Sequence, residues 1–244
     1  MISNFIIASN PFFEAYIQSD IIGKLIFIGL IILSITSWAI LLHKLWLTYQ
    51  AKKNSLLFER NFSAQKKAPL QMHSDLQKNG LNPFYTLYEV LKKNTLELLN
   101  KNRHFANEQE ATSYLSPADI DFVRNHLAST IAIQTQRLEK NLFILATVVS
   151  LGPFLGLLGT VWGILTTFSD MTTSHAASNM HHSILGGLSL ALAATVLGLI
   201  DAIPALIGYN YLKNNIRDFE TDMDMFAQEI LASVEMQYRK VDLD

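Results

Sequence analysis

Three long apolar stretches dominate the sequence and predict helices that cross a membrane. The run from Ile21 to Leu42 is almost continuously apolar, apart from Lys24 near its start and three hydroxyl side chains. Residues 141–168 contain no charged residue, and residues 184–211 contain a single one. At about 1.5 Å of rise per residue, each stretch can span a bilayer. We therefore expect an all-α protein with three transmembrane helices, the first at 21–46 and the others at 141–168 and 184–211.

The polar residues after the first span predict a helical and loop region at 47–116 and then a further helix. Ser116 is a typical N-cap residue, Pro117 stands at the first helical position, and Asp119 places a negative charge in the first turn. This pattern predicts a helix at 117–140 that runs without a break into the second span.

Apolar positions continue beyond the third span, at alternating steps of three and four residues within 212–244. The seam consists of Leu212, Ile216, Phe219, Met223, Phe226, Ile230 and Gln237, with Ser233 as a polar gap. The charges of this segment exclude a fourth span. Residues 44–140 carry 14 basic and 9 acidic groups, whereas residues 213–244 carry 4 and 8. Because their net charges are opposite, we expect the two polar parts to pack together. Two of the spans would then extend into a long cytoplasmic helical bundle.

The distribution of basic residues predicts the orientation in the membrane. Fourteen of the 19 Lys and Arg residues lie between Lys44 and Lys140, and four more follow the third span. The segment 1–20 and the connection 169–183 have none. Basic residues near helix ends are retained on the cytoplasmic side, so we expect an outward N-terminal segment, an outward loop at 169–183 and a cytoplasmic C-terminus. Without a basic n-region, the first apolar segment should not be cleaved as a signal peptide.

Small residues recur along one face of the second and third predicted spans. On the second span, at about 100° per residue, they fall within about 60° of each other. These residues are Gly152, Gly156, Gly159 and Gly163. On the third span the corresponding residues are Gly187, Ala191, Ala194, Gly198, Ala202 and Ala205. Small residues spaced in this way allow close helix packing in lipid. We expect both faces to pack against other helices and to meet neighbouring subunits around a shared polar axis.

Three polar side chains within the spans are candidates for a proton or ion path. Thr160 and Thr195 each lie about 80° from the centre of the small-residue face of their helix, so both could line a narrow polar path. Alternatively, each hydroxyl bonds a backbone carbonyl one turn earlier. Asp201 costs a few kcal/mol inside a membrane and therefore usually faces a partner or a water-filled cavity. Its alternative is to reach headgroup water near the cytoplasmic end of the helix.

Composition and motifs exclude several other classes of protein. Half of the residues are hydrophobic and 16% are charged, the formal net charge is −2, and cysteine is absent. These values do not favour a nucleic-acid-binding protein, and they exclude disulfides and thiolate zinc sites. No hydrolase or ATPase motif occurs, so we expect neither an enzyme nor a cofactor. His175, His181 and His182 make a poor chelate, and we expect no metal site.

Several strings of residues in the spans resemble the MotA/TolQ/ExbB proton-channel family. The matching strings are Gly152–Ile164 in the second span, Ala194–Leu199, Ala202–Ala205 and Tyr209–Asn210 in the third, and Ser37–Ile40 and Lys44–Trp46 in the first. Three spans with an outward N-terminus are more similar to TolQ and ExbB than to MotA. The resemblance implies a multi-pass protein of the bacterial inner membrane that couples the proton-motive force to work on the cell envelope.

The resemblance also implies partners and site residues. It implies a homo-oligomeric, pentamer-like ring, two single-span partners of the TolR or ExbD type, and force delivered through a TolA- or TonB-like protein. Thr160 and Thr195 match the two pore threonines of the family. The family has a glutamate where this chain has Leu190, while Asp201 stands where a small apolar residue is usual. These two positions are 11 residues apart, hence about 20° apart around the helix, and we hypothesise that the carboxylate has moved along one pore-facing stripe.

Two other functions are alternatives to this one. A membrane scaffold would retain the ring and its partners without conducting protons, because it lacks the carboxylate at position 190. A substrate-binding transporter would have broken helices and inverted repeats, and the uninterrupted second span argues against that class.

Overall fold

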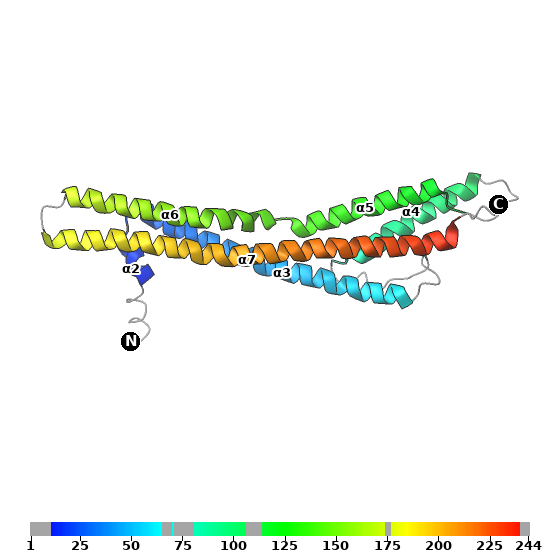
Figure 1. Ribbon diagram of the computed structural model, residues 1–244, viewed down its shortest axis with the longest axis horizontal. Helices are drawn as coiled ribbons and strands as arrows, with labels where there is room; N and C mark the ends of the chain where they lie inside the picture. The colour runs from blue at the N-terminus through cyan, green and yellow to red at the C-terminus, as the bar shows by residue number, and fades with distance from the viewer. Residues whose placement is uncertain (1–10, 65–69, 71–80, 106–113, 174–176, 240–244) are drawn as a thin grey trace. The chain divides into compact units, whose positions relative to one another are not determined.

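The computed structural model describes residues 11–64, 70, 81–105, 114–173 and 177–239. These residues are almost entirely helical, which confirms the all-α prediction (Figure 1). The helices are α2 (Pro11–Gln18), α3 (Ile21–Ala64), α4 (Pro83–Phe105), α5 (Pro117–Glu139), α6 (Leu142–Thr173) and α7 (Ala177–Tyr238). In the described part of the chain, three helices are long and apolar enough to cross a membrane, namely Ile21–Ser63, Leu142–Thr172 and Ile184–Tyr238.

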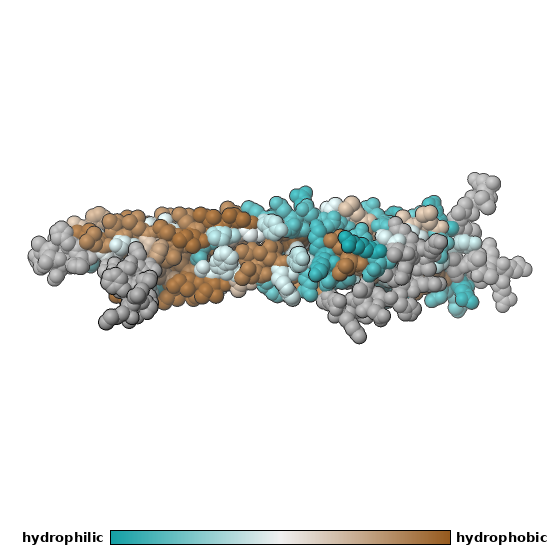
Figure 2. Space-filling view, turned by 90° about the horizontal axis from the view of Figure 1, so that it is seen from below, coloured by the Kyte–Doolittle hydropathy of each residue, from teal (hydrophilic) through white to brown (hydrophobic). Residues whose placement is uncertain are grey.

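The chain divides into two compact units. The first, here called the apolar unit, comprises Met1–His43 and Asn141–Tyr211, and the second, the polar unit, comprises Lys44–Lys140 and Leu212–Asp244. Hydrophobic residues cover most of the apolar unit's surface that Figure 2 shows, whereas polar residues cover much of the polar unit. This contrast matches the solvents that the two parts require, because exposed apolar side chains are stable in lipid and charged ones in water.

Helix α7 packs on both other long helices of the apolar unit. A Cβ built on Gly23 of α3 would lie 2.9 Å from Leu190, and one built on Gly208 would overlap the Leu41 side chain. Residue numbers increase in the same direction along both helices, from the Gly23–Leu190 contact to the Leu41–Gly208 contact, so α3 and α7 run parallel. Helix α6 runs antiparallel to α7, because Gly152 lies against Gly198 while Gly163 lies against Gly187.

An aromatic cluster forms the core of the polar unit. Phe226 of α7 contacts the rings of Phe58 and Phe62 on α3 and stacks on Phe84 of α4, with ring centroids 4.4 Å apart in the stacked pair. An ion pair between Lys52 and Asp222, 3.3 Å long, also joins α3 to α7. The two polar parts of the sequence therefore pack together, as their charges predicted.

The predicted seam of α7 is buried from Leu212 to Ile230. Beyond Ile230 the prediction is wrong, because Gln237 is exposed and Val234 is buried instead. A step of four from Ile230 to Val234 keeps the seam on the same helix face, and an apolar side chain favours burial there. The Ser233 hydroxyl donates to the carbonyl of Glu229 in its own helix.

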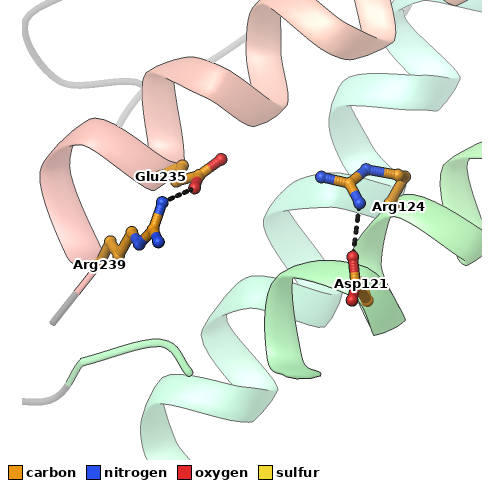
Figure 3. Close-up of polar contacts among 4 residues, drawn as sticks. All are labelled: Asp121, Arg124, Glu235 and Arg239. Carbon is orange, nitrogen blue, oxygen red and sulfur yellow. Dashed lines mark hydrogen bonds and ion pairs between the residues drawn. The ribbon is translucent and has the colours of Figure 1, made fainter. Parts of the chain in front are cut away.

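Two further ion pairs in the polar unit join residues that are close in the sequence. Figure 3 shows Arg124 directed toward Asp121 on α5, and Arg239 directed toward Glu235 on α7. Both pairs have the three- or four-residue spacing that brings side chains together on a helix surface. Such exposed pairs add little stability, so buried apolar side chains, the aromatic cluster among them, are the main source of cohesion in this unit.

Helix α5 begins as the sequence predicts but ends earlier. Ser116 and Asp119 form a complete capping box. The expected unbroken helix into the second span is wrong, because α5 ends at Glu139 and α6 begins at Leu142. Asn141 has a φ of 71°, in the left-handed region that interrupts a right-handed helix. Apolar periodicity continues across this break and does not reveal it. The local signal is Asn141, since asparagine is one of the few non-glycine residues that tolerate this conformation.

The carbonyl groups at the end of α5 have partners. Lys140 N–H donates to the Gln136 carbonyl. The Lys44 ammonium, 4% exposed, donates to the Leu138 carbonyl over 2.8 Å. A cation at a helix C-terminus interacts favourably with the unpaired carbonyls and the helix dipole. Lys44 of α3 therefore stabilises the position at which α5 stops.

Candidate functional site

The small-residue faces of α6 and α7 lie against each other within one chain. A Cβ built on Gly163 would lie 2.6 Å from the Gly187 carbonyl oxygen, and one built on Gly152 would lie 2.9 Å from that of Gly198. On Gly156 it would lie 3.0 Å from the Thr195 Cα. These distances leave no room for a side chain, so the two backbones touch.

The remaining small residues continue this seam. Gly159 lies against Ala194, and Ala191 lies beside Gly163. The sequence predicts that these faces meet neighbouring subunits. In the structure the two faces pack against each other within one chain, because two faces of glycine and alanine can approach most closely.

The two candidate threonines make different hydrogen bonds. The Thr195 hydroxyl lies within hydrogen-bonding distance of the Gly156 carbonyl across the seam, at 3.2 Å, and of the Ala191 carbonyl in its own helix, at 3.3 Å. The Thr160 hydroxyl donates to the Leu157 carbonyl over 2.7 Å. Thr160 thus shows the bonding within its own helix that the sequence left open as an alternative. Of these two threonines, Thr195 is the one whose hydroxyl lies near a carbonyl of the other helix.

Asp201 is buried against α3. Its side chain is 7% exposed, and the Ser34 hydroxyl of α3 lies beside the carboxyl group as its potential hydrogen-bond partner. Ser34 lies in the middle of the apolar stretch of α3, and the nearby Ile35, Ile200 and Ile203 are exposed. The carboxyl group therefore points into the protein at a level where the outer surface is apolar. This arrangement does not match the alternative in which Asp201 reaches headgroup water.

Leu190 lies on the same face of α7 as Asp201, as the 11-residue spacing predicted. It is 2% exposed and packs in an apolar cluster with Ala15, Phe27 and Ala193. Both positions therefore face α3 within the chain. The stripe that we expected to line a pore is covered by this helix.

Sequence reasoning missed a second carboxylate in the apolar unit. Asp20 caps α3 by accepting a hydrogen bond from the Gly23 N–H at 2.9 Å. It also accepts from the indole N–H of Trp162 on α6, at 3.0 and 2.9 Å to its two oxygens. An acidic residue just before an apolar helix is a recognisable N-cap signal. Its bond to Trp162, 142 residues away, has no such local signal.

Metal ligands do not gather in the described part of the chain, where no group of three or more His, Asp or Glu side chains could hold an ion. Two of the histidines considered above, His181 and His182, are in α7, but their side chains are outside the description, as is all of His175.

These features define a class of membrane protein with three apolar helices, a backbone-to-backbone seam and a buried carboxyl group. Residues 97–225, more than half of the chain, match the MotA/TolQ/ExbB proton channel family. The chain belongs to this family. It is therefore a multi-pass protein of the inner membrane, and its family consists of transport components.

Three relatives illustrate where the chain stands in the family. It is 29% identical to the Tol-Pal system protein TolQ of Haemophilus influenzae, over 94% of this chain and 96% of that one. It is 27% identical to the biopolymer transport protein ExbB of Pseudomonas putida, over 90% of this chain and 62% of that one. It is also 44% identical to ExbB of Aquifex aeolicus, over 41% of this chain and 66% of that one. Both types of relative are thus about equally similar to this chain.

Proposed function

We propose that this protein is the proton-channel subunit of a TolQ–TolR or ExbB–ExbD type motor. The motor would couple the proton-motive force to Tol-Pal envelope maintenance or to TonB-dependent import. The observation that carries the proposal is the family match, which includes α5, α6 and most of α7. Of these helices, α6 and α7 form the glycine seam, and α7 holds Thr195 and Asp201. The relatives named TolQ and ExbB support the same function.

The proposal includes the arrangement in the membrane and the partners. The N-terminus would be periplasmic and the C-terminus cytoplasmic, with spans at 21–46, 141–168 and 184–211. The concentration of basic residues between Lys44 and Lys140 supports this orientation. Several copies, as in a pentamer, would surround a single-span protein of the TolR or ExbD type, and a TolA- or TonB-like protein would carry force to the envelope.

The polar residues of the apolar unit would carry protons. Asp201 is the only charged residue between 184 and 211 and can bind and release a proton. Thr195 would contribute a hydroxyl at the α6–α7 seam. Thr160 is half-buried and would join the path when its hydroxyl leaves the Leu157 carbonyl.

One observation favours a second function, a membrane scaffold that does not conduct. Position 190 holds a leucine packed among Ala15, Phe27 and Ala193, which cannot exchange protons. A scaffold would still form the ring and bind the single-span partner.

The two functions differ in proton flux through the reconstituted complex. The full chain, co-expressed with a single-span partner, is purified, its intact mass is measured, and the complex is placed in liposomes under an imposed pH gradient. A motor subunit should co-purify with the partner and conduct. Asp201→Asn should reduce flux to that of empty liposomes, whereas Asp170→Asn, an exposed position outside the seam, should leave it unchanged. Assembly without flux would favour the scaffold, and a monomer without any partner would contradict both.

A further inference from the structure

Helices α3 and α7 form a straight parallel seam in the apolar unit. Gly23 meets Leu190, Ser34 meets Asp201, and Leu41 meets Gly208. The two residues of each pair are 167 positions apart in the sequence, so the helices keep one register along this contact. Between these levels Ile26 and Leu30 pack on Ala194. The Ser34–Asp201 pair is a polar contact with apolar contacts on both sides.

No charged side chain on the packed helices is placed to neutralise Asp201. On α3 the nearest candidates are Lys24 and His43, ten and nine residues from Ser34, which is about 13 to 15 Å along the helix. Lys44 donates to the Leu138 carbonyl. Residues 142–168 of α6 contain no charged residue, and Asp201 is the only one in 184–211 of α7. The neighbour of the Asp201 carboxyl group in this seam is therefore a neutral group, the Ser34 hydroxyl.

A hydroxyl can serve both protonation states of a carboxyl group. It donates a hydrogen bond to the carboxylate, and it accepts one from the carboxylic acid. An ammonium group can only donate and would hold the carboxylate charged. Ser34 therefore suits a carboxyl group that binds a proton and then releases it, and burial of a polar pair in this apolar seam is otherwise costly.

We propose that Ser34 is the positioning residue for proton binding by Asp201, and that this proton site lies in the α3–α7 seam inside one subunit. The inference rests on the proposed function. One proton entering the site bonds to a carboxylate oxygen of Asp201, and the same O–H bond breaks when the proton leaves. The Ser34 hydroxyl changes from donor to acceptor and back, and it is not consumed.

Infrared spectroscopy of the full chain in liposomes tests the contact itself. The acid-minus-neutral difference spectrum should contain a carboxylic C=O band that disappears in Asp201→Asn. Ser34→Ala should move this band to higher wavenumber because the hydrogen bond is lost, and Ser34→Thr should restore its position. Thr36→Ala is the matched control on α3, since the Thr36 hydroxyl donates to the Ile32 carbonyl and not to Asp201.

Proton flux through the complex with its single-span partner tests the role of the contact. Ser34→Ala should reduce flux by about three- to ten-fold, the factor expected for one lost hydrogen bond in a membrane. Ser34→Thr should keep most of it, and Thr36→Ala all of it. If Ser34→Ala does not assemble, Ser34→Cys, which retains a weak donor, should give an intermediate flux and an intermediate band position.

The outcomes separate this inference from the proposed function. If the wild-type complex does not conduct but the band shifts in Ser34→Ala, the motor function fails and the Ser34–Asp201 proton site stands. If the wild type conducts while Ser34→Ala changes neither flux nor band, the inference is overturned and the motor stands. Absence of any Asp201-dependent band also overturns the inference.

Discussion

At the scale of single residues, Gly198 shows how closely α6 and α7 approach. A Cβ built there would overlap the Gly152 carbonyl and lie 3.3 Å from the Gly156 Cα. The obstacle is the backbone of α6, which cannot rotate away as a side chain can. The space at this contact therefore restricts the position to glycine.

Gly198→Ala should destabilise the chain by about 1 to 3 kcal/mol, the usual cost of overpacking a close contact. Thermal unfolding in detergent, followed by circular dichroism, measures the effect. Gly29→Ala is the matched control, because a Cβ on Gly29 meets nothing within 4 Å. The control should be neutral or slightly stabilising, since alanine favours helix. Equal stability of the two variants would contradict the described α6–α7 seam.

Asp119 is a residue whose charge contributes to folding of the polar unit. Burial alone would raise its pKa, but hydrogen bonds from the Ser116 N–H, the Asn102 amide and the Ser116 hydroxyl, together with the charge of Lys101, hold the pKa below its ordinary value of 3.8. A lowered pKa means that the folded state binds a proton less tightly than the unfolded state. The resulting stabilisation is present above pH 3.8 and is lost as the pH falls below it.

Asp119→Asn should therefore reduce the loss of stability that the wild type shows on acidification below about pH 4. Ser116→Ala should cost about 1 kcal/mol at neutral pH, because the N-cap bond to the Asp119 N–H is lost. Chemical unfolding at a series of pH values measures both. Asp121→Asn is the control, since Asp121 is exposed and pairs only with Arg124 in the contacts described. If the wild type, Asp119→Asn and Asp121→Asn all lost stability equally on acidification, the contribution of Asp119 would be refuted.

At the scale of elements, the break between α5 and α6 is a defined feature of the backbone. Asn141 has positive φ, α5 ends at Glu139, and Lys44 binds the Leu138 carbonyl. The break therefore has both a conformational cause and a side chain that pairs with the freed carbonyls.

Asn141→Gly should preserve or slightly increase stability, whereas Asn141→Val should lower it by about 1 to 2 kcal/mol, because a β-branched side chain is disfavoured in the left-handed conformation and lacks the local hydrogen bonding of asparagine. Asn125→Val is the control, because Asn125 is exposed within α5. Denaturant titration of the three variants gives the ranking. If Val were tolerated equally at both positions, α5 and α6 would be joined by ordinary helix.

At the scale of the whole molecule, the chain consists of two units suited to different solvents. The polar unit depends on an aromatic core, in which Phe226 touches Phe58, Phe62 and Phe84. The apolar unit depends on backbone contact between α6 and α7. Damage to one kind of packing should thus affect one unit first.

Phe226→Ala should destabilise the polar unit by about 3 to 5 kcal/mol. Trypsin digestion in detergent micelles can locate the damage, because residues 141–211 contain no Lys or Arg. The variant should be cut faster at Arg124 and Arg137 while a fragment containing 141–211 persists. Met236→Ala, at a fully exposed position, should be cut at the wild-type rate. If Phe226→Ala and the wild type were cleaved at equal rates, the aromatic core would not be what protects the polar unit from unfolding.

Much of the architecture was predictable because its signals are local. Apolar length predicts the three long helices, residue spacing predicts the seam of α7 as far as Ile230, and Ser116 with Asp119 predicts the start of α5. The shared face of Leu190 and Asp201 also follows from helix geometry alone. Each of these features depends on residues within a few turns of one another.

The sequence by itself determined the helices, their apolar and small-residue faces, and the family to which the chain belongs. Only the tertiary structure decided which faces meet. It placed the α6 and α7 glycines against each other, Asp201 against Ser34, and Trp162 against Asp20. Periodicity gives the direction of a side chain relative to its own helix axis, but it carries no information about which other helix will lie there. That choice depends on the combined packing of all the helices.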